Sequence, residues 1–499
     1  MHEVAKSVAR NTFIMMSAQV ITWASSFVLM LFLPKYLGSS RYGELYLAIS
    51  ITMMFQVIIE FGGQYHITKE VSRSHNSAPN ILVNSAISRI FLWVISIILM
   101  LLFSRVAGYA WQVLILIIIL GTAKLWEGIN SLLRNCYQGF ELMEYPSIGS
   151  VAERIFLMVT AISFLIAGFG QIVIALLMAL STLINFIISA SFAKKIIPSL
   201  PKIDFEETKT LLKQGVPYFL WSIFATIYYR IDVIMLSIMT SYSVVGWYGA
   251  AYKLFDVLMF FPFIFTQALF PVLTRLADNT KERLTTAVQK SIDVTFFVGI
   301  PITIILYSFA SPITELLFGL KEYQPSIEIL KIFSIGLLLV YIDFILGSTV
   351  LATDRQKKWS MIAGIAIIIN MGLNYLLIPY FQKTSGNGGV GSSIATIITE
   401  FFIMCSAVIL LKGRISNPLN VAFILKEALS GSLMLAAIIM IRDLDINWII
   451  QTLTGISVYL ATLFLFYIHK NGKEILSIDY LSNVKDFINS IIYKGEAKA

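Results

Sequence analysis

The stretch VPYFLWSIFATIYYRIDVIMLSIM, residues 216–239, decides the fold. It contains two charged side chains, Arg230 and Asp232, and is otherwise uncharged. A helix rises about 1.5 Å per residue, so this run can cross a hydrocarbon core of about 30 Å. Lipid offers the backbone no hydrogen-bond partner, and the alternation of apolar and polar residues that a barrel strand needs is absent. The stretch is therefore predicted to be a transmembrane helix.

Similar apolar runs recur along the whole chain. The 499 residues are 57% hydrophobic and only 13% charged, which leaves too little charge to cover the surface of a soluble domain. We therefore predict an all-α polytopic membrane protein with about 14 transmembrane helices. The predicted spans are 12–33, 43–62, 82–103, 110–133, 147–167, 171–192, 216–239, 245–271, 289–310, 327–350, 359–380, 390–411, 421–441 and 447–468.

The placement of lysine and arginine predicts the orientation. With the N-terminus in the cytoplasm, about 25 basic residues fall on the cytoplasmic side, about 7 outside and about 5 within spans, as the positive-inside rule requires. We expect a multi-pass protein of the plasma or inner membrane with both termini in the cytoplasm. The net charge of +8 reflects this loop bias and attraction to anionic lipid. Nucleic-acid binding would need a basic soluble face and is not expected.

A polar and basic segment, 194–214, divides the spans into six before and eight after. Asp204 and Glu207 have capping-box spacing, so this cytoplasmic linker contains either a short amphipathic surface helix or no helix. The tail has apolar residues at helical spacing. The predicted units are an N-terminal lobe over 1–193, the linker over 194–214, a C-terminal lobe over 215–411, two further spans within 412–469 and a cytoplasmic amphipathic tail over 470–499.

The two six-span halves resemble each other weakly. RYGELYLAIS at 41–50 matches GWYGAAYKLF at 246–255 through the Tyr-Gly pairs 42–43 and 248–249. Equivalent spans run in the same direction. A duplication would therefore relate two pseudo-symmetric lobes by an axis along the membrane normal, with a site between them.

Charged side chains inside the spans are the candidate site residues. A charge at the bilayer centre costs at least about 2.5 to 3.5 kcal/mol and needs a partner or a wet cavity. Lys124 and Glu127 are three residues apart, and so are Lys253 and Asp256. Each pair therefore shares a helix face and is either a structural ion pair or part of a site.

The spacing of Arg230 and Asp232 differs. They are two residues apart, roughly 200° around the helix, and cannot pair on one face. Arg230 and Lys253 lie at similar depth, so we expect Asp232 to bridge to Lys253 and Arg230 to be left to meet an anion. Arg89 and Arg154 lie in the cytoplasmic halves of their spans. They either reach back to the cytoplasm or extend a path for an anionic substrate.

Motifs for covalent chemistry are missing from the sequence. It contains no GxxxxGK[ST] motif, no Ser/His/Asp cluster and no loop large enough for a glycosyltransferase site. Its four histidines lack metal-ligand spacing. We therefore expect a membrane transporter rather than an enzyme, with no metal and no cofactor.

Three motifs point to a known family. FLPKYLGSSRYGELYLAIS at 32–50 resembles the P-x-x-L-G-x-x-x-Y-G junction of polysaccharide transporters. These are the oligosaccharide flippases of the multidrug/oligosaccharidyl-lipid/polysaccharide exporter superfamily. YYRIDVIMLS at 228–237, followed by VVGWYGAAYKL, resembles that family's seventh and eighth helices. LATDRQKKWSMIAGIAIIINMGLNYLLIPYF at 351–381, followed by GGVGSSIATIITE, resembles its eleventh and twelfth.

The resemblance implies two six-helix lobes around a cationic cavity, two further C-terminal helices, and outward flipping of a polyprenyl-diphosphate-linked oligosaccharide for surface polysaccharide biosynthesis. It implies alternating access, and it favours Lys124, Arg230 and Lys253 over Arg89 and Arg154 as residues that meet the substrate. Membrane lipids and, as candidate partners, a glycan polymerase or glycosyltransferases would surround it. Unlike the drug exporters of the superfamily, the first span has no acidic residue, so Glu60 is the candidate to bind a coupling ion, H⁺ or Na⁺.

Two alternatives remain open at this stage. An exporter of cationic drugs would need an acidic cavity, whereas the charges in the spans are mainly basic or paired. A non-transporting scaffold of a glycan-assembly complex would make the cavity cations dispensable.

Overall fold

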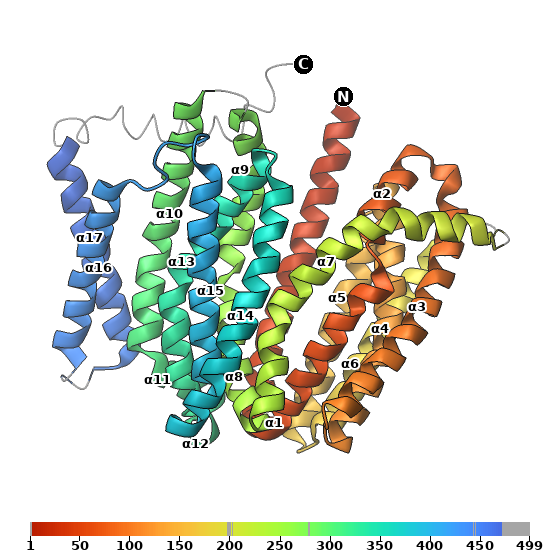
Figure 1. Cartoon of the computed structure of the whole chain (residues 1–499), viewed down its shortest axis with the longest axis horizontal. Helices are drawn as coiled ribbons and strands as arrows, with labels where there is room; N and C mark the ends of the chain where they lie inside the picture. Colours follow the sequence, from red (N-terminus) through yellow and green to blue (C-terminus); the bar gives the residue numbers. More distant parts are fainter. Residues whose placement is uncertain are drawn as a thin grey trace.

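The computed structural model (Figure 1) is a bundle of long helices. It describes residues 2–196, 201, 203–277, 280–442, 444 and 446–471. This part of the chain contains no β-strand, which confirms the predicted all-α class. From residue 472 on, the predicted amphipathic tail lies outside the described residues.

The first half of the chain forms six α-helices and a short 3-10 helix, His75–Ser77. The α-helices are α1 His2–Glu60, α2 Gly63–Arg73, α3 Ala78–Val106, α4 Trp111–Gly139, α5 Glu144–Ile166 and α6 Gln171–Ile196. Two predicted spans lie within α1, because the backbone leaves the helical conformation at Gly38, with φ 74° and ψ 169°. The chain turns back there (Figure 1). Only glycine adopts this conformation without strain, so the predicted junction is a sharp elbow.

The second half contains the seventh span and all that follow. Its helices are α7 Phe205–Met239, α8 Tyr242–Leu258, α9 Phe260–Ala277, α10 Lys281–Ser308, α11 Ala310–Phe318, α12 Leu320–Tyr323, α13 Ser326–Ala352, α14 Gln356–Ser385, α15 Gly388–Leu411, α16 Val421–Arg442 and α17 Trp448–Asn471. The predicted eighth span is divided between α8 and α9, which meet at Met259, three residues before Pro262.

The described residues provide the predicted number of crossings. Thirteen segments among them are long and apolar enough to cross a membrane. The first, Phe13–Glu60, has 48 residues, about twice the length that one crossing needs. Because it turns back at Gly38, it supplies two crossings, which gives fourteen in all.

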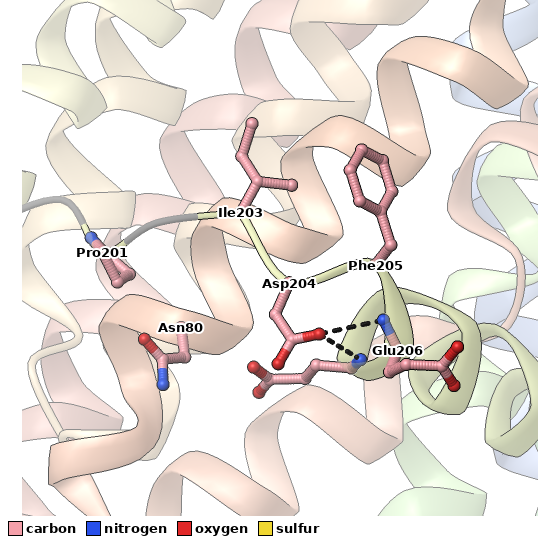
Figure 2. A pocket seen from close by; sticks show the side chains of 7 residues that line it. Asn80, Pro201, Ile203, Asp204, Phe205 and Glu206 are labelled. Carbon is pink, nitrogen blue, oxygen red and sulfur yellow. Dashed lines mark hydrogen bonds between the residues drawn. The ribbon is translucent and has the colours of Figure 1, made fainter.

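The helix α7 connects the two halves. Asp204 caps it by accepting hydrogen bonds from the N–H groups of Glu206 and Glu207 at 2.9 and 3.2 Å, as Figure 2 shows. The predicted cap is therefore confirmed. The second half of the expected capping box is supplied by α3, where Asn84 Oδ1 accepts from Asp204 N at 2.9 Å. The helix then runs without a break to Met239, so the described residues of the linker contain no surface helix separate from α7.

The two halves are joined at one end of the bundle, which we call the elbow side because it contains Gly38 and α12. Ser39 N donates to Glu322 Oε2 at 2.6 Å. Tyr323 Oη donates to the carbonyl of Pro34 at 3.1 Å. At the opposite end, the N-terminal side, the helices of the two halves diverge (Figure 1). There α7 contacts α2 and α3.

The largest apolar core is shared by both halves. It includes Leu45 of α1, Ile117 of α4, Val245 of α8 and Leu337 of α13, all fully buried or nearly so. The last two helices, α16 and α17, pack against α10 through a smaller cluster of their own. This shared core fixes the positions of α7 and α8, and with them the polar side chains in the middle of these two helices.

Candidate functional site

Arg230 lies in the membrane-spanning part of α7 and is half-buried. Its neighbours are Tyr46 of α1 and Tyr252 and Asp256 of α8. Within the described part of the chain, no carboxylate lies within salt-bridge distance of Arg230. The guanidinium therefore lies where helices of both halves meet, without an ion-pair partner among the described residues.

The pair on α8 confirms the prediction from spacing. Lys253 Nζ lies 3.5 Å from Asp256 Oδ2, and the two side chains are 39% and 35% exposed. Charges with this exposure in the middle of a span would be very costly against lipid, so they must face water or a polar ligand. Arg230 and this pair form the first cluster of the site, which we call the α7–α8 cluster.

The predicted bridge from Asp232 to Lys253 is wrong. Asp232 is buried and accepts hydrogen bonds from Tyr248 Oη at 3.0 Å, Asn374 Nδ2 at 2.7 Å and Thr396 Oγ1 at 2.9 Å. Three donors can satisfy a buried carboxylate without a cation. Periodicity correctly separated Asp232 from Arg230 but could not identify which helix lies on each side of α7.

A second cluster, the α4–α5 cluster, surrounds Glu127. Lys124 Nζ lies 2.6 Å from Glu127 Oε2, which confirms the predicted pair. Arg154 of α5 and Arg134 of α4 also attract this carboxylate electrostatically. Lys124 is only 12% exposed, whereas Glu127 is 46% exposed, so the carboxylate marks the open side of the cluster.

Arg134 was missed from the sequence because it falls one residue beyond the predicted span 110–133. A signal for it exists. Arg134 follows Glu127 by seven residues, or two helical turns, so the two side chains lie on the same face. Three cations around one carboxylate leave the α4–α5 cluster with a surplus of positive charge.

Arg89 is held inside the first half and does not join either cluster. Its side chain is buried, with the residue only 3% exposed. Its Nη1 donates to the carbonyl of Gly128 and to Ser131 Oγ, the latter at 2.8 Å. These bonds tie α3 to α4. Arg154, by contrast, is exposed, so the two arginines that were predicted together have different surroundings.

Glu60 ends α1 and is half-buried. Gln56 Nε2 donates to its Oε1 at 3.2 Å. Glu60 and Arg89 line a small cavity of about 30 Å³. This cavity lies at the N-terminal side of the first half. The binding of a coupling ion by Glu60 stays a prediction.

A larger cavity, of about 510 Å³, lies beside the start of α7 (Figure 2). Asp204, Glu206 and Glu207 line it. Its carboxylates would repel a phosphate group, so it does not suit the predicted substrate.

Sequence reasoning also missed a group of acids in the second half. Tyr228 Oη donates to Glu400 Oε1 of α15 at 2.5 Å. Asp343 of α13, the single charge in the predicted span 327–350 besides Glu328 and Lys331 near its start, lies against Glu400. The signal for Glu400 was its position as the single charge in the predicted span 390–411.

Comparison with known proteins connects these features to a family. The family model described as polysaccharide biosynthesis protein matches residues 8–277. A second model, MatE, matches residues 217–376. A probable low-salt glycan biosynthesis flippase, Agl15 of Haloferax volcanii, is 23% identical over 403 residues, which cover 78% of this chain and 80% of that protein. The capsular polysaccharide biosynthesis protein CapF of Staphylococcus aureus is 28% identical over 145 residues, which cover 28% of this chain and 34% of CapF.

Solved structures share the fold. The lipid II flippase MurJ in an inward closed conformation aligns with a TM-score of 0.75 at 16% identity, covering 92% of this chain and 99% of that one. A multidrug transporter of the MATE family in an inward-facing conformation aligns with a TM-score of 0.66 at 16% identity, covering 79% and 95%.

Proposed function

Because the chain belongs to the polysaccharide biosynthesis protein family, whose model matches more than half of it, we propose that it is a flippase. It carries a polyprenyl-diphosphate-linked oligosaccharide from the cytoplasmic to the outer leaflet for cell-surface polysaccharide biosynthesis. The observation that carries this proposal is the surplus of cations over carboxylates in two clusters on the membrane-spanning helices. The α7–α8 cluster contains Arg230 and Lys253 with one carboxylate, and the α4–α5 cluster contains Lys124, Arg134 and Arg154 with one carboxylate.

The two kinds of cation have different tasks. Arg230 has no ion-pair partner among the described residues, and its planar guanidinium can bind two phosphate oxygens at once. Lys253 acts as a point charge and can exchange Asp256 for the diphosphate. Because the lipid tail is apolar, it stays in the bilayer while the headgroup and sugars occupy the polar region between the lobes.

Alternating access is the proposed mechanism. The positive-inside distribution assigns the N-terminal side to the cytoplasm and the elbow side to the outside. The joined elbow side and the divergent N-terminal side then correspond to a state that receives substrate from the cytoplasm. Rocking of the lobes about the site would separate the elbow side and bring the cytoplasmic ends together.

The membrane potential would assist the outward step. A diphosphate carries a charge of about −2, and moving each charge outward across an inside-negative membrane gains about 2.3 kcal/mol per 100 mV. Arg230 and Lys253 would cancel this gain in free energy only if they crossed the membrane together with the diphosphate. Because they are fixed in the protein, the negative charge of the substrate crosses alone.

Two other functions predict different behaviour. An exporter of cationic drugs would need carboxylates in excess at the site, whereas the two clusters together contain more cations than carboxylates. A scaffold for a glycan-assembly complex would not need the cations. It would instead depend on a docking surface, for which the tail over 474–499 is the candidate.

The test is translocation in proteoliposomes of a fluorescent polyprenyl-diphosphate oligosaccharide, read out by an impermeant quencher. Arg230→Ala and Lys253→Ala should each reduce the rate strongly, while Arg414→Ala, an exposed arginine in the loop after α15, should leave it unchanged. If both site variants flip at the wild-type rate and deletion of 474–499 abolishes flipping, the proposal is wrong and the scaffold is favoured.

A further inference from the structure

A pair of acidic side chains lies inside the second half, apart from the cations. Asp343 of α13 is 8% exposed, and neither of its carboxylate oxygens has a hydrogen-bond partner. It lies in contact with Glu400 of α15. Burying an ionised carboxylate without donors costs several kcal/mol, so an unpartnered Asp343 requires an explanation.

Glu400 is the more accessible member of the pair and is half-buried. Its Oε1 accepts the hydrogen bond from Tyr228 Oη at 2.5 Å. One turn before Glu400 on α15, Thr396 donates to Asp232. The pair therefore sits between α7, α13 and α15, next to a third carboxylate that already has its own donors.

The charged and titratable groups around the pair are not basic. Cys405 of α15 and Glu400 face Asp343. Tyr228 and Asp232 of α7, together with Asp343, face Glu400. No lysine or arginine forms an ion pair with either acid in the described part of the chain. Two carboxylates in contact without a cation cannot both be ionised, because their repulsion and desolvation are not offset.

We propose that Asp343 and Glu400 share one proton and form a proton-binding site of this protein. The proton lies between the two carboxyl groups and gives one of them an O–H that donates to the other. Tyr228 fixes the Glu400 carboxyl through its hydrogen bond to Oε1. The ligand is a proton rather than a metal ion, because three acids share the region and one of them, Asp232, is already satisfied by hydroxyl and amide donors.

The charge of the pair can influence the substrate site electrostatically, and this step rests on the proposed flippase function. Tyr229, which is 56% exposed, lies near both Glu400 and Asp256. Asp256 is the ion-pair partner of Lys253. Loss of the shared proton would add a negative charge close to the α7–α8 cluster and weaken its hold on an anion. Proton release and substrate release would thereby be coupled.

The proton can be detected without transport. Infrared spectra of the purified full chain in nanodiscs, recorded over a range of pH, should show a carbonyl band of a protonated carboxyl group that persists after exposed carboxyl groups have ionised. Asp343→Asn and Glu400→Gln should each lose this band. Glu282→Gln, an exposed acid at the start of α10, should keep it. A wild-type protein whose spectrum has no component lost in both variants would overturn the proposal.

Two further measurements test the proposal if a variant does not fold, and test whether the pair binds sodium instead of a proton. If Asp343→Asn does not fold, Tyr228→Phe, which removes only a hydroxyl, should shift the band, and an unchanged band would overturn the proposal. Replacing potassium by sodium should leave the band in place. Its displacement by sodium would make the pair a sodium site instead.

The transport arm separates this proposal from the proposed function. In proteoliposomes, a pH gradient should change the flipping rate of the wild type, and Glu400→Gln should lose that response. If no flipping occurs in any variant, the function fails but the infrared result still decides the proton site. If the wild type flips without the band, the proton site fails alone.

Discussion

At the scale of single residues, the environment of each intramembrane charge depends on helix spacing and on the neighbouring helix together. Spacing of three predicted the Lys124–Glu127 and Lys253–Asp256 pairs, which the structure contains at 2.6 and 3.5 Å. A pair on one helix needs only local geometry. Asp232 shows the limit, because its donors come from three other helices, and those on α14 and α15 lie 142 and 164 residues further along the chain.

Arg89 and Arg230 should respond differently to the loss of charge. Arg89→Leu removes buried hydrogen bonds to Gly128 and Ser131, so we expect a loss of about 1–3 kcal/mol in the free energy of unfolding. Arg230→Leu removes a half-buried group without an ion-pair partner in the described residues and should change stability little. Affinity for the diphosphate headgroup should change in the reverse order, with a large loss in Arg230→Leu and little change in Arg89→Leu.

The measurement is thermal unfolding of both variants in detergent, beside binding of a fluorescent polyprenyl-diphosphate lipid. Arg89→Lys is the matched control, because it keeps a cation and can keep one hydrogen bond. An Arg89→Leu protein that melts like the wild type but no longer binds the lipid would place Arg89 in the site and contradict this assignment.

At the scale of secondary-structure elements, close contact of α1 with α8 joins the halves. Gly43 and Gly246 lie at this crossing. A Cβ added at Gly43 would overlap the carbonyl oxygen of Tyr242, and one added at Gly246 would overlap that of Ser39. Backbone atoms cannot move aside as a flexible side chain can. The helices are therefore close because both positions lack a side chain.

Gly246→Ala should disrupt this crossing. In an unconstrained helix, replacing glycine by alanine stabilises by roughly 0.5–1 kcal/mol. At Gly246 the overlap with Ser39 outweighs that gain, so we expect a lower melting temperature. Gly364→Ala in α14 is the matched control, because a Cβ there meets nothing within 4 Å.

Differential scanning fluorimetry of the two variants in the same detergent checks this prediction. The control should melt at or above the wild-type temperature. Equal melting of Gly246→Ala and Gly364→Ala would mean that the α1–α8 crossing is looser than the structure indicates.

At the scale of the whole molecule, the elbow side is held by contacts between the two halves. Glu322 accepts from the backbone N–H of Ser39 right after the elbow at Gly38. Trp247 Nε1 donates to the carbonyl of Glu322 at 2.7 Å, which fixes this residue from the second half. Any state that opens at this side must break these contacts, because they connect the two bodies that would rock.

A covalent link across the elbow side should therefore stop transport. In a protein carrying Cys136→Ala and Cys405→Ala, the changes Ser39→Cys and Glu322→Cys place two thiols on opposite halves. A short, reducible thiol cross-linker should abolish flipping, and reduction should restore it. The same linker on either single-cysteine variant is the control. Full cross-linking with an unchanged flipping rate would rule out rocking at this side.

The sequence by itself determined the helical class, the number of crossings, the cap at Asp204 and the ion pairs within single helices. Each of these depends on residues close together in the chain, where hydrophobic length and helical period act directly. It could not determine the partners of Asp232, the burial of Arg89 or the contact between Asp343 and Glu400. Those depend on which helices pack side by side, and an apolar helix surface in a membrane protein fits several neighbours about equally well. Only the tertiary structure decides among them.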